Sequence, residues 1–461
     1  MNDSTPQANR PTARRRWLLL LVLLPLALGA IAVAILGFSE YRSARAVTAE
    51  IARLQAVGEP VDNETMARWF QANTSQAGTA AWREIFVAVE HVSSGEAVGS
   101  FPFLGTGELP ADLVPGGDWP DEPRIAEFLQ EVRPLIVQIE QAAQYPTPVW
   151  QPIVFDSFST LLPEIQSSRS VIRLLQLDVQ HALYHRDTER AVRGFASMQA
   201  TAAAFEWDFC LVAELVSIAL RGVHRDAIRR SLANTSWEPG QLDQLLGQVA
   251  DPRDVATCWQ RTLAGERAML LGLLRGSPEK RDAVLHQERV SFPEIWLLIP
   301  SITQRYLDCM AAVQQIGADG VLGMTARAKT LEQENDRSKK GPFGDILINL
   351  FLPAVSAFAH ANERDELDRR LTRTALGINR YHVSEGRWPA KLSDLAAVGL
   401  QACDWTALQA GPFGYRVEPE GVVVWAYDAH DPVSPGRIRN EPPDEEELAT
   451  NTSLWHVTRI R

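Results

Sequence analysis

The hydrophobic and polar positions set one uninterrupted apolar run apart from the rest of the chain. Residues 17–38 contain no charged side chain. A helix of about 20 apolar residues crosses the ~30 Å hydrocarbon core of a bilayer, whereas a secretory signal peptide carries an apolar stretch of only ~7–15 residues. The run therefore predicts a retained transmembrane helix with the lipid bilayer as its partner. The alternative is a signal peptide cleaved near Ala30 or Ala32.

Basic residues before the span predict its orientation. Four arginines precede it: Arg10, Arg14, Arg15 and Arg16. Lys and Arg close to a span resist translocation, whereas a long domain that follows a span crosses largely regardless of its charge. We therefore expect residues 1–16 to form a cytoplasmic basic tail, with a single-pass anchor in the inner membrane and a periplasmic body.

Apolar residues that recur every three or four positions predict helices in the segment after the anchor, residues 39–121. We expect a stalk helix over 41–57, a second helix to Gln71 capped by Asp62 or Asn63, and a third over 80–92 capped by Thr79. Residues 93–122 are rich in Gly and Pro and predict a surface loop.

The next segment, residues 122–344, is helical by pattern almost throughout. The predicted helices cover 123–144, 159–185, 188–206, 208–232, 238–249, 253–275 and 302–334. Short connections place consecutive helices antiparallel, and no fixed repeat of 34 to 45 residues is present. The pattern therefore predicts an irregular bundle of helical hairpins rather than a solenoid.

The last segment, residues 345–461, changes character. The apolar run 346–358 is too short for a second span and predicts a buried or interfacial helix. A helix over 361–383 and a short helix over 390–398 follow. Residues rich in Val, Trp and Tyr then predict three strands, over 415–417, 422–427 and 454–460. The whole chain is therefore expected to be mainly α, with a small C-terminal α+β unit that carries a short antiparallel sheet.

Composition and charge exclude one class of partner. The chain is 46% hydrophobic with 13 Trp, enough for packed cores, and its net charge is −12. Because the residues up to the anchor are basic, the body is more acidic still. Nucleic-acid binding requires clustered Lys and Arg, so we expect no nucleic-acid partner.

The four cysteines, Cys210, Cys258, Cys309 and Cys403, lie far apart and form no CxxC motif. They therefore resemble neither a zinc ribbon nor a redox pair. Outside the cytoplasm they allow up to two disulfides. The alternative is that they are small buried apolar residues, as free cysteines often are.

The C-terminal segment contains a distinctive series of residues: Ala375, Leu376, Tyr381, Gly386, Pro389, Leu392, Leu395, the run Gly411 to Tyr415, and a strand that ends in Tyr427. In this series the segment resembles the globular part of major, G-type pseudopilins of type II secretion. The resemblance implies a helix packed on an antiparallel sheet. It also implies calcium binding after that strand, where Asp428 and Asp431 fall, but Pro432 replaces the usual Gly and favours a solvated acidic turn.

A second resemblance rests on four stretches: Gly58 to Val61, Gly78 to Trp82, the 208–232 helix and Gly265 to Met269. With these stretches the chain resembles, over its whole length, uncharacterised single-span bacterial proteins of the planctomycete type. This resemblance implies a helical extracytoplasmic body with a pilin-like tail. It implies no particular activity.

One spacing in the body is compatible with a metal ion. His181 and His185 are one helical turn apart, with Asp178 and Glu189 on the same face. Polar groups at this spacing are more typical of an exposed helix flank, so we assign no metal ligand, cofactor or catalytic residue. The histidines of the tail, His360, His382 and His430, are expected to be structural.

No catalytic motif supports an enzyme. The sequence contains no GxSxG, P-loop, HExxH or GxGxxG motif. We therefore expect a membrane-anchored, non-catalytic interaction or scaffold protein with an unknown protein partner. One alternative is a component of a type II secretion or pilus-like assembly, and a second is a metal-dependent enzyme with an unrecognised site.

Overall fold

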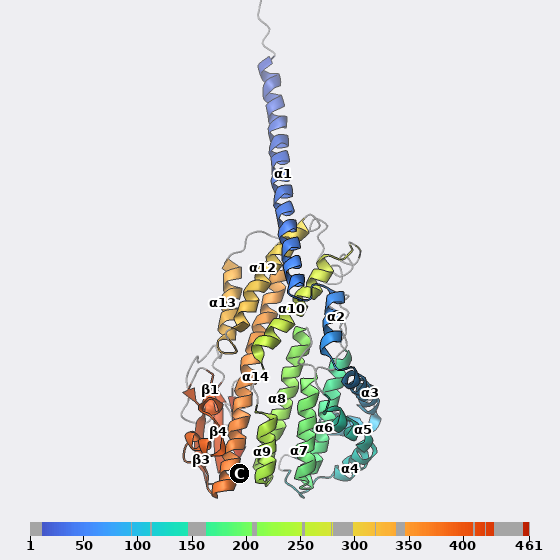
Figure 1. Cartoon of the computed structure of the whole chain (residues 1–461), viewed down its shortest axis with the longest axis vertical. Helices are drawn as coiled ribbons and strands as arrows, with labels where there is room; N and C mark the ends of the chain where they lie inside the picture. Colours follow the sequence, from blue (N-terminus) through green and yellow to red (C-terminus); the bar gives the residue numbers. More distant parts are fainter. Residues whose placement is uncertain are drawn as a thin grey trace, which may run out of the picture.

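A computed structural model describes most of the chain. The described residues are 12–93, 95–110, 113–145, 163–204, 210–250, 254–277, 279, 298–318, 320–337, 346–408, 411–419, 421–427 and 455–460. They are mostly helical, with short antiparallel sheets near the C-terminus (Figure 1). The expected mainly α fold class is therefore confirmed.

The described helices follow one another in the order seen in Figure 1. The first half of the chain contains α1 (Thr12–Ala56), α2 (Asn63–Asn73), α3 (Gln76–Ser93), a 3-10 helix η1 (Glu96–Ser100), α4 (Glu122–Glu131), α5 (Arg133–Ala142), α6 (Pro163–Tyr184), α7 (Thr188–Ala203) and α8 (Leu211–Asn234). The second half contains α9 (Pro239–Gln248), α10 (Val255–Leu274), α12 (Ile299–Ala318), α13 (Met324–Arg337), α14 (Ile346–Glu385) and the 3-10 helices η3 (Leu392–Val398) and η4 (Ala402–Trp405).

The anchor and the stalk form one continuous helix. Helix α1 runs for 45 residues and projects from one end of the body (Figure 1). Its apolar side chains from Leu23 to Phe38 are exposed, and α1 is the one helix among the described residues that is long and apolar enough to cross a membrane. Pro25 lies inside the helix without ending it. Exposed apolar side chains along this length are the surface that lipid covers in a membrane span.

The end of α1 is part of the packed body. Ile51 and Leu54 are buried in a small apolar cluster with Val61, Leu271 of α10 and Leu307 of α12. Because side chains of α1, α10 and α12 share this cluster, the stalk is held against the body rather than joined to it by a flexible linker.

Two larger apolar cores fill the body. One includes residues of α3, the α5 to α9 region and the C-terminal tail, and the other includes residues of α10, α12, α13 and the first half of α14. Helix α14 contributes to both, with Phe358 in one core and Leu371 in the other. It therefore joins the end of the body next to α1 to the opposite end (Figure 1).

The tail sheet lies beside the second half of α14 (Figure 1). Its strands are β3 (Gly414–Glu418), β4 (Gly421–Tyr427) and β5 (Trp455–Ile460), in the order β3-β4-β5 and all antiparallel. A second sheet pairs β1 (Thr406–Ala407) with β2 (Gly411–Pro412). The three predicted strands and the helix packed on them are confirmed.

Four predicted helix boundaries are wrong, and each error has a local cause. The predicted helix 123–144 is two helices, because Pro134 has no N–H and its ring clashes with the preceding turn. The predicted helix 302–334 is also two, separated by Gly320 and Gly323 at φ 79° and 73°. Helix α3 begins at Gln76 rather than Ala80, since Ser75 rather than Thr79 accepts the Gly78 N–H at 3.1 Å.

The fourth error concerns α14, which is one helix where two were predicted. Pro353 lies on its exposed face, so water can satisfy the carbonyl of Asn349 that Pro353 leaves without a donor. Ile348, Leu352 and Val355 face the core instead. The helix expected over 346–358 as buried or interfacial is therefore present, with one face buried and the other exposed. The predicted loop 93–122 is mostly irregular, as expected, apart from η1.

The four cysteines form no disulfide. Cys210 and Cys258 are buried, Cys309 is partly buried and Cys403 is exposed. The alternative of small buried residues is therefore correct for Cys210 and Cys258 and wrong for Cys403.

Candidate functional site

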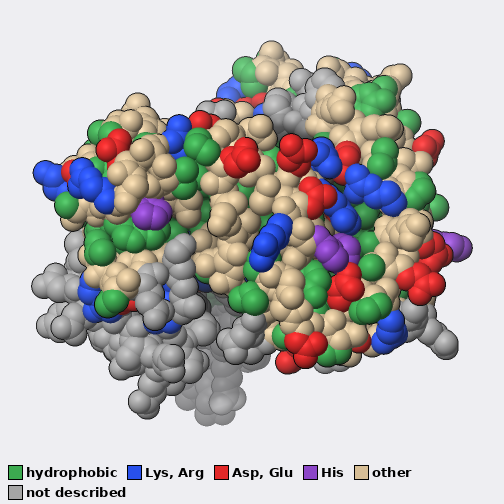
Figure 2. Space-filling model, turned by 90° about the horizontal axis from the view of Figure 1, so that it is seen from below, with side chains coloured by type: hydrophobic (Ala, Val, Ile, Leu, Met, Phe, Trp, Pro, Cys, Tyr) green, Lys and Arg blue, Asp and Glu red, His purple; other side chains and the backbone are tan. Residues whose placement is uncertain are grey.

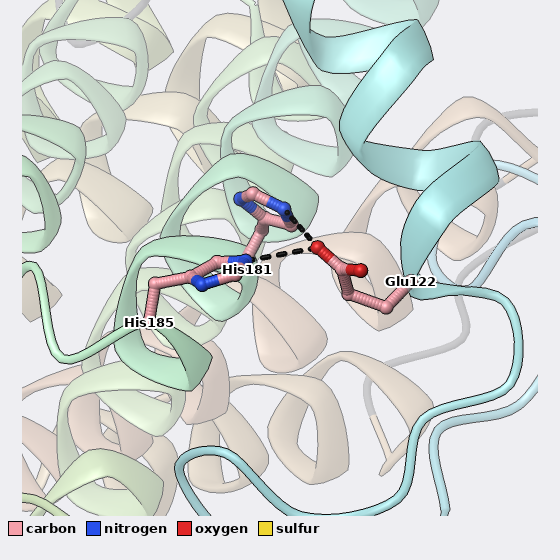
Figure 3. Close-up of side chains that lie close together, drawn as sticks. All are labelled: Glu122, His181 and His185. Carbon is pink, nitrogen blue, oxygen red and sulfur yellow. Dashed lines mark hydrogen bonds and ion pairs between the residues drawn. The ribbon is translucent and has the colours of Figure 1, made fainter.

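Two histidines and one glutamate converge where α4 begins and α6 ends. The Nε2 atoms of His181 and His185 lie 3.1 Å and 2.9 Å from the same oxygen, Oε1 of Glu122. Both rings point from α6 toward the start of α4 (Figure 3). One atom of each side chain falls in a group whose members all lie within 4.8 Å of one another.

Helix α6 presents the two histidines on one side. Residues four apart in a helix lie one above the other, and the two ring centroids are 4.5 Å apart. The helix ends at Tyr184, and His185 directly follows it, with its N–H donating to the His181 carbonyl at 3.1 Å. Next, Arg186 adopts a left-handed conformation at φ 60° and the Asp187 N–H donates to the Ala182 carbonyl. His185 therefore lies at the end of α6, next to solvent.

A loop tied to α6 places Glu122. Gly116 donates its N–H to the Tyr184 carbonyl at 3.0 Å, and the Tyr184 hydroxyl donates to the Gly117 carbonyl at 2.7 Å. The Trp119 ring packs edge-on against Tyr184, with 5.3 Å between the centroids. These contacts join the loop before α4 to the same turn of α6 that carries the histidines. Glu122 then occupies the first turn of α4, where a carboxylate is favoured by the helix dipole.

The three side chains differ in how far they are exposed to solvent. The exposed fraction is 9% for the His181 side chain, 19% for Glu122 and 49% for His185. Burial lowers the pKa of His181, and the nearby Arg190 guanidinium lowers it further. The hydrogen bond with His185 lowers the pKa of Glu122, with a further contribution from His181. At neutral pH the cluster therefore holds a carboxylate and a neutral His181.

Arg190 and Asp178 border the cluster on its inner side. Arg190 Nε donates to Asp178 Oδ1 at 3.1 Å, and Arg190 Nη1 lies 3.5 Å from His181 Nδ1. Asp178 therefore binds Arg190 rather than a histidine. Glu189, which the sequence places near the histidines, is not in the converging group.

The other histidines and acidic residues considered from the sequence are not part of this cluster. His382 stacks on Trp388 with 3.7 Å between ring centroids, which is a packing role. His360 lies in α14. His430, Asp428 and Asp431 fall outside the described residues.

Sequence reasoning missed Glu122, the residue that completes the cluster. It lies 59 positions before His181 and follows a Gly- and Pro-rich loop. Its position at the start of a predicted helix is the one sequence feature that draws attention to Glu122. Nothing in the spacing of the chain indicates that this helix start meets the end of α6.

Comparisons with known proteins give no match, so the geometry of the site is the evidence for what it can do. No family model matches this chain, and neither a curated protein nor a solved structure matches it.

A cavity of about 400 Å³ lies between α8 and α14. Its charged wall is formed by Arg225, Arg229, Asp365 and Asp368. Arg225 Nε lies 2.7 Å from Asp368 and Arg229 Nη1 lies 2.6 Å from the same carboxylate, while Arg225 also pairs with Asp365. These charges neutralise one another across the helix pair, so their first effect is to hold α8 against α14.

Proposed function

We propose that this chain is a single-pass membrane protein that presents its helical body outside the cytoplasm as a non-catalytic binding or scaffold module. The N-terminal tail lies in the cytoplasm and the body in the periplasm. The bilayer is the partner of residues 17–38, and a second protein is the partner of the body.

The mounting of the body on α1 is the observation that carries this proposal. Apolar side chains are exposed along the first part of α1, while Ile51 and Leu54 in the same helix are buried in the body. One end of this helix is apolar and exposed, and the other end is packed against the body. Such a helix holds the body at a fixed distance from a bilayer. This geometry suits a protein that positions a surface for a partner.

The distribution of charge favours a protein partner over nucleic acid. The end of the body opposite α1 carries acidic and basic side chains interspersed with apolar ones (Figure 2). A surface of mixed sign does not neutralise a row of phosphates. Protein partners, in contrast, bind surfaces in which apolar and polar groups alternate.

Co-purification tests the proposed function. The full chain, with a purification tag at its C-terminus, would be extracted from membranes in mild detergent after crosslinking. We expect one partner protein at a constant molar ratio to the chain. A chain that elutes alone and monodisperse, with and without crosslinking, would contradict the scaffold proposal but leave the membrane anchor intact.

The tail supports a second candidate function, membership of a secretion or pilus-like assembly. The second half of α14 lies beside the antiparallel sheet, the arrangement that the pseudopilin resemblance implies. Deletion of the gene would then reduce export of secreted proteins. Unchanged export in the deletion strain would count against this candidate.

A further inference from the structure

We propose that Glu122, His181 and His185 bind one divalent transition-metal ion of the Zn²⁺ class. The donor set is two imidazole nitrogens and one carboxylate oxygen, which suits Zn²⁺, Co²⁺, Ni²⁺ and Cu²⁺ better than Ca²⁺ or Mg²⁺. This inference goes beyond the proposed scaffold function, because it concerns a ligand of the body rather than its mounting.

The spacing of the donors fits a shared ion. Zn²⁺ lies about 2.0–2.2 Å from nitrogen and oxygen ligands, so neighbouring donors in a tetrahedral site are roughly 3.3–3.6 Å apart, a few tenths of an ångström more than a hydrogen bond. The Nε2 atoms of His181 and His185 lie 3.1 Å and 2.9 Å from Glu122 Oε1. An ion could therefore replace the two hydrogen bonds with little movement of either helix.

The charge of the surroundings also favours a cation. Glu122 and Asp178 contribute two carboxylates and Arg190 one guanidinium. These three side chains therefore leave one negative charge in excess beside the two imidazoles. His185 is half exposed, which leaves a path for the ion and room for a water molecule as a fourth ligand.

Arg190 is the group that opposes metal binding. A neutral histidine that binds metal through Nε2 carries its proton on Nδ1, but Arg190 Nη1 approaches that atom at 3.5 Å. The contact is long and Arg190 is held mainly by Asp178. Binding therefore requires a small rotation of the guanidinium away from the ring. Asp178 lies three positions before His181 in α6 and has one buried oxygen without a hydrogen bond, so it is a candidate acceptor for the Nδ1 proton once the guanidinium has moved.

The bound ion would crosslink the start of α4 to the end of α6, and so also restrain the loop that leads into α4. Glu122 belongs to one element and the two histidines to the other, so coordination adds a crosslink between them. We therefore expect metal to raise the thermal stability of the body and to protect the loop of residues 113–121 from proteolysis.

The test uses the full chain in detergent micelles, purified with a tag that contains no histidine and freed of metal with a chelator. Titration with ZnCl2 would be followed by calorimetry, and titration with CoCl2 by its visible absorption spectrum, which reports coordination number. We expect one ion per chain and a rise in Tm with Zn²⁺. Mg²⁺ at the same concentration should have no effect.

Two variants and one control decide the outcome. Glu122→Gln keeps an oxygen that accepts hydrogen bonds from both histidines but is a poor ligand, and His185→Ala removes the exposed donor. Each should weaken Zn²⁺ binding at least tenfold and abolish the rise in Tm, whereas His91→Ala in α3 should behave as the wild type. Absence of binding in the wild type, or equal binding in all four proteins, would overturn the proposal.

Discussion

The carboxylate of Glu40 accepts a hydrogen bond from the backbone N–H of Ser301, with 3.1 Å between Oε2 and nitrogen. Glu40 lies two residues after the apolar run, and Ser301 lies in the first turn of α12. Two residues of helix rise about 3 Å. If residues 17–38 lie in the hydrocarbon core, as proposed above, the start of α12 lies at the level of the lipid headgroups.

Leu54 tests whether the stalk is an integral part of the body. Its side chain is fully buried between α1, α10 and α12, so Leu54→Ala removes packed atoms and leaves a cavity. We expect a loss of roughly 2–5 kcal/mol in the free energy of unfolding, measured with denaturant in detergent. Leu28→Ala is the matched control, because Leu28 is 57% exposed in the same helix. Equal losses in the two variants would mean that α1 does not pack on the body.

Gly317 tests the packing of α12 on α10. A Cβ at this position would lie 2.4 Å from the ring of Trp259. That ring cannot move easily, because it stacks on Phe358 and its Nε1 donates to the Val313 carbonyl at 3.0 Å. Gly317→Ala should therefore cost about 1–3 kcal/mol of stability.

Gly272→Ala in α10 is the control for this variant. A Cβ at Gly272 meets no atom within 4 Å, so the substitution should raise stability by about 0.5–1 kcal/mol through helix propensity. Thermal unfolding followed by circular dichroism measures both changes. A Gly317→Ala variant that is as stable as Gly272→Ala would contradict the close contact.

Glu266 makes stability depend on pH. Burial raises its pKa from 4.5 to about 7, while its Oε1 accepts the Leu211 N–H at 2.8 Å. Between these two pH values the unfolded chain releases a proton that the folded chain retains. The contribution of Glu266 to stability is therefore complete below pH 4.5 and is lost as the pH rises toward 7, by roughly 3 kcal/mol at about 1.4 kcal/mol per pKa unit.

Glu266→Gln isolates this effect. The Gln oxygen can still accept the Leu211 N–H but does not titrate. The stability of the variant relative to the wild type should therefore increase from pH 4.5 to pH 7. Taking the difference removes the opposite contribution of His224, whose pKa burial lowers to about 3. A difference that stays constant across this range would show that Glu266 does not retain its proton in the folded protein.

Arg225 tests the ionic contacts between α8 and α14. It is buried between the carboxylates of Asp365 and Asp368, so Arg225→Met removes one buried ionic partner from each of them, although Asp368 keeps its pair with Arg229. We expect a loss of about 3–5 kcal/mol of stability. The control is Arg416→Met, whose pairing with Glu418 is half exposed and contributes about 0–1 kcal/mol. Similar midpoints of urea unfolding for the two variants would refute the structural role of the buried pair.

Periodicity in the sequence predicts most of the elements, because each depends on neighbours within a few positions. The three strands of the tail, the long apolar helix and the cap at Asp62 are local features. The break before α5 also has a local signal, because Pro134 disfavours a continuous helix. The continuity of α14 has no such signal, because whether Pro353 ends the helix depends on which face of the helix is exposed to water.

Contacts between distant residues are beyond such reasoning. Arg225 and Asp365 are 140 positions apart, and Glu122 and His185 are 63 positions apart. The sequence identified His181 and His185 as possible ligands, because four-residue spacing is local. It could not indicate Glu122, because the meeting of α4 and α6 is set by the packing of the whole bundle.

Cys403 provides the most direct test of the membrane topology. It is exposed on the body, whereas Cys210 and Cys258 are buried, and burial raises the pKa of Cys309 to about 11. In intact spheroplasts a membrane-impermeant maleimide should label the wild type at Cys403 and should not label Cys403→Ser. A cysteine introduced as Ser4→Cys in the Cys403→Ser chain should react only after the membrane is permeabilised. Labelling of Cys403 only after permeabilisation, or labelling of the tail cysteine in intact spheroplasts, would contradict the account.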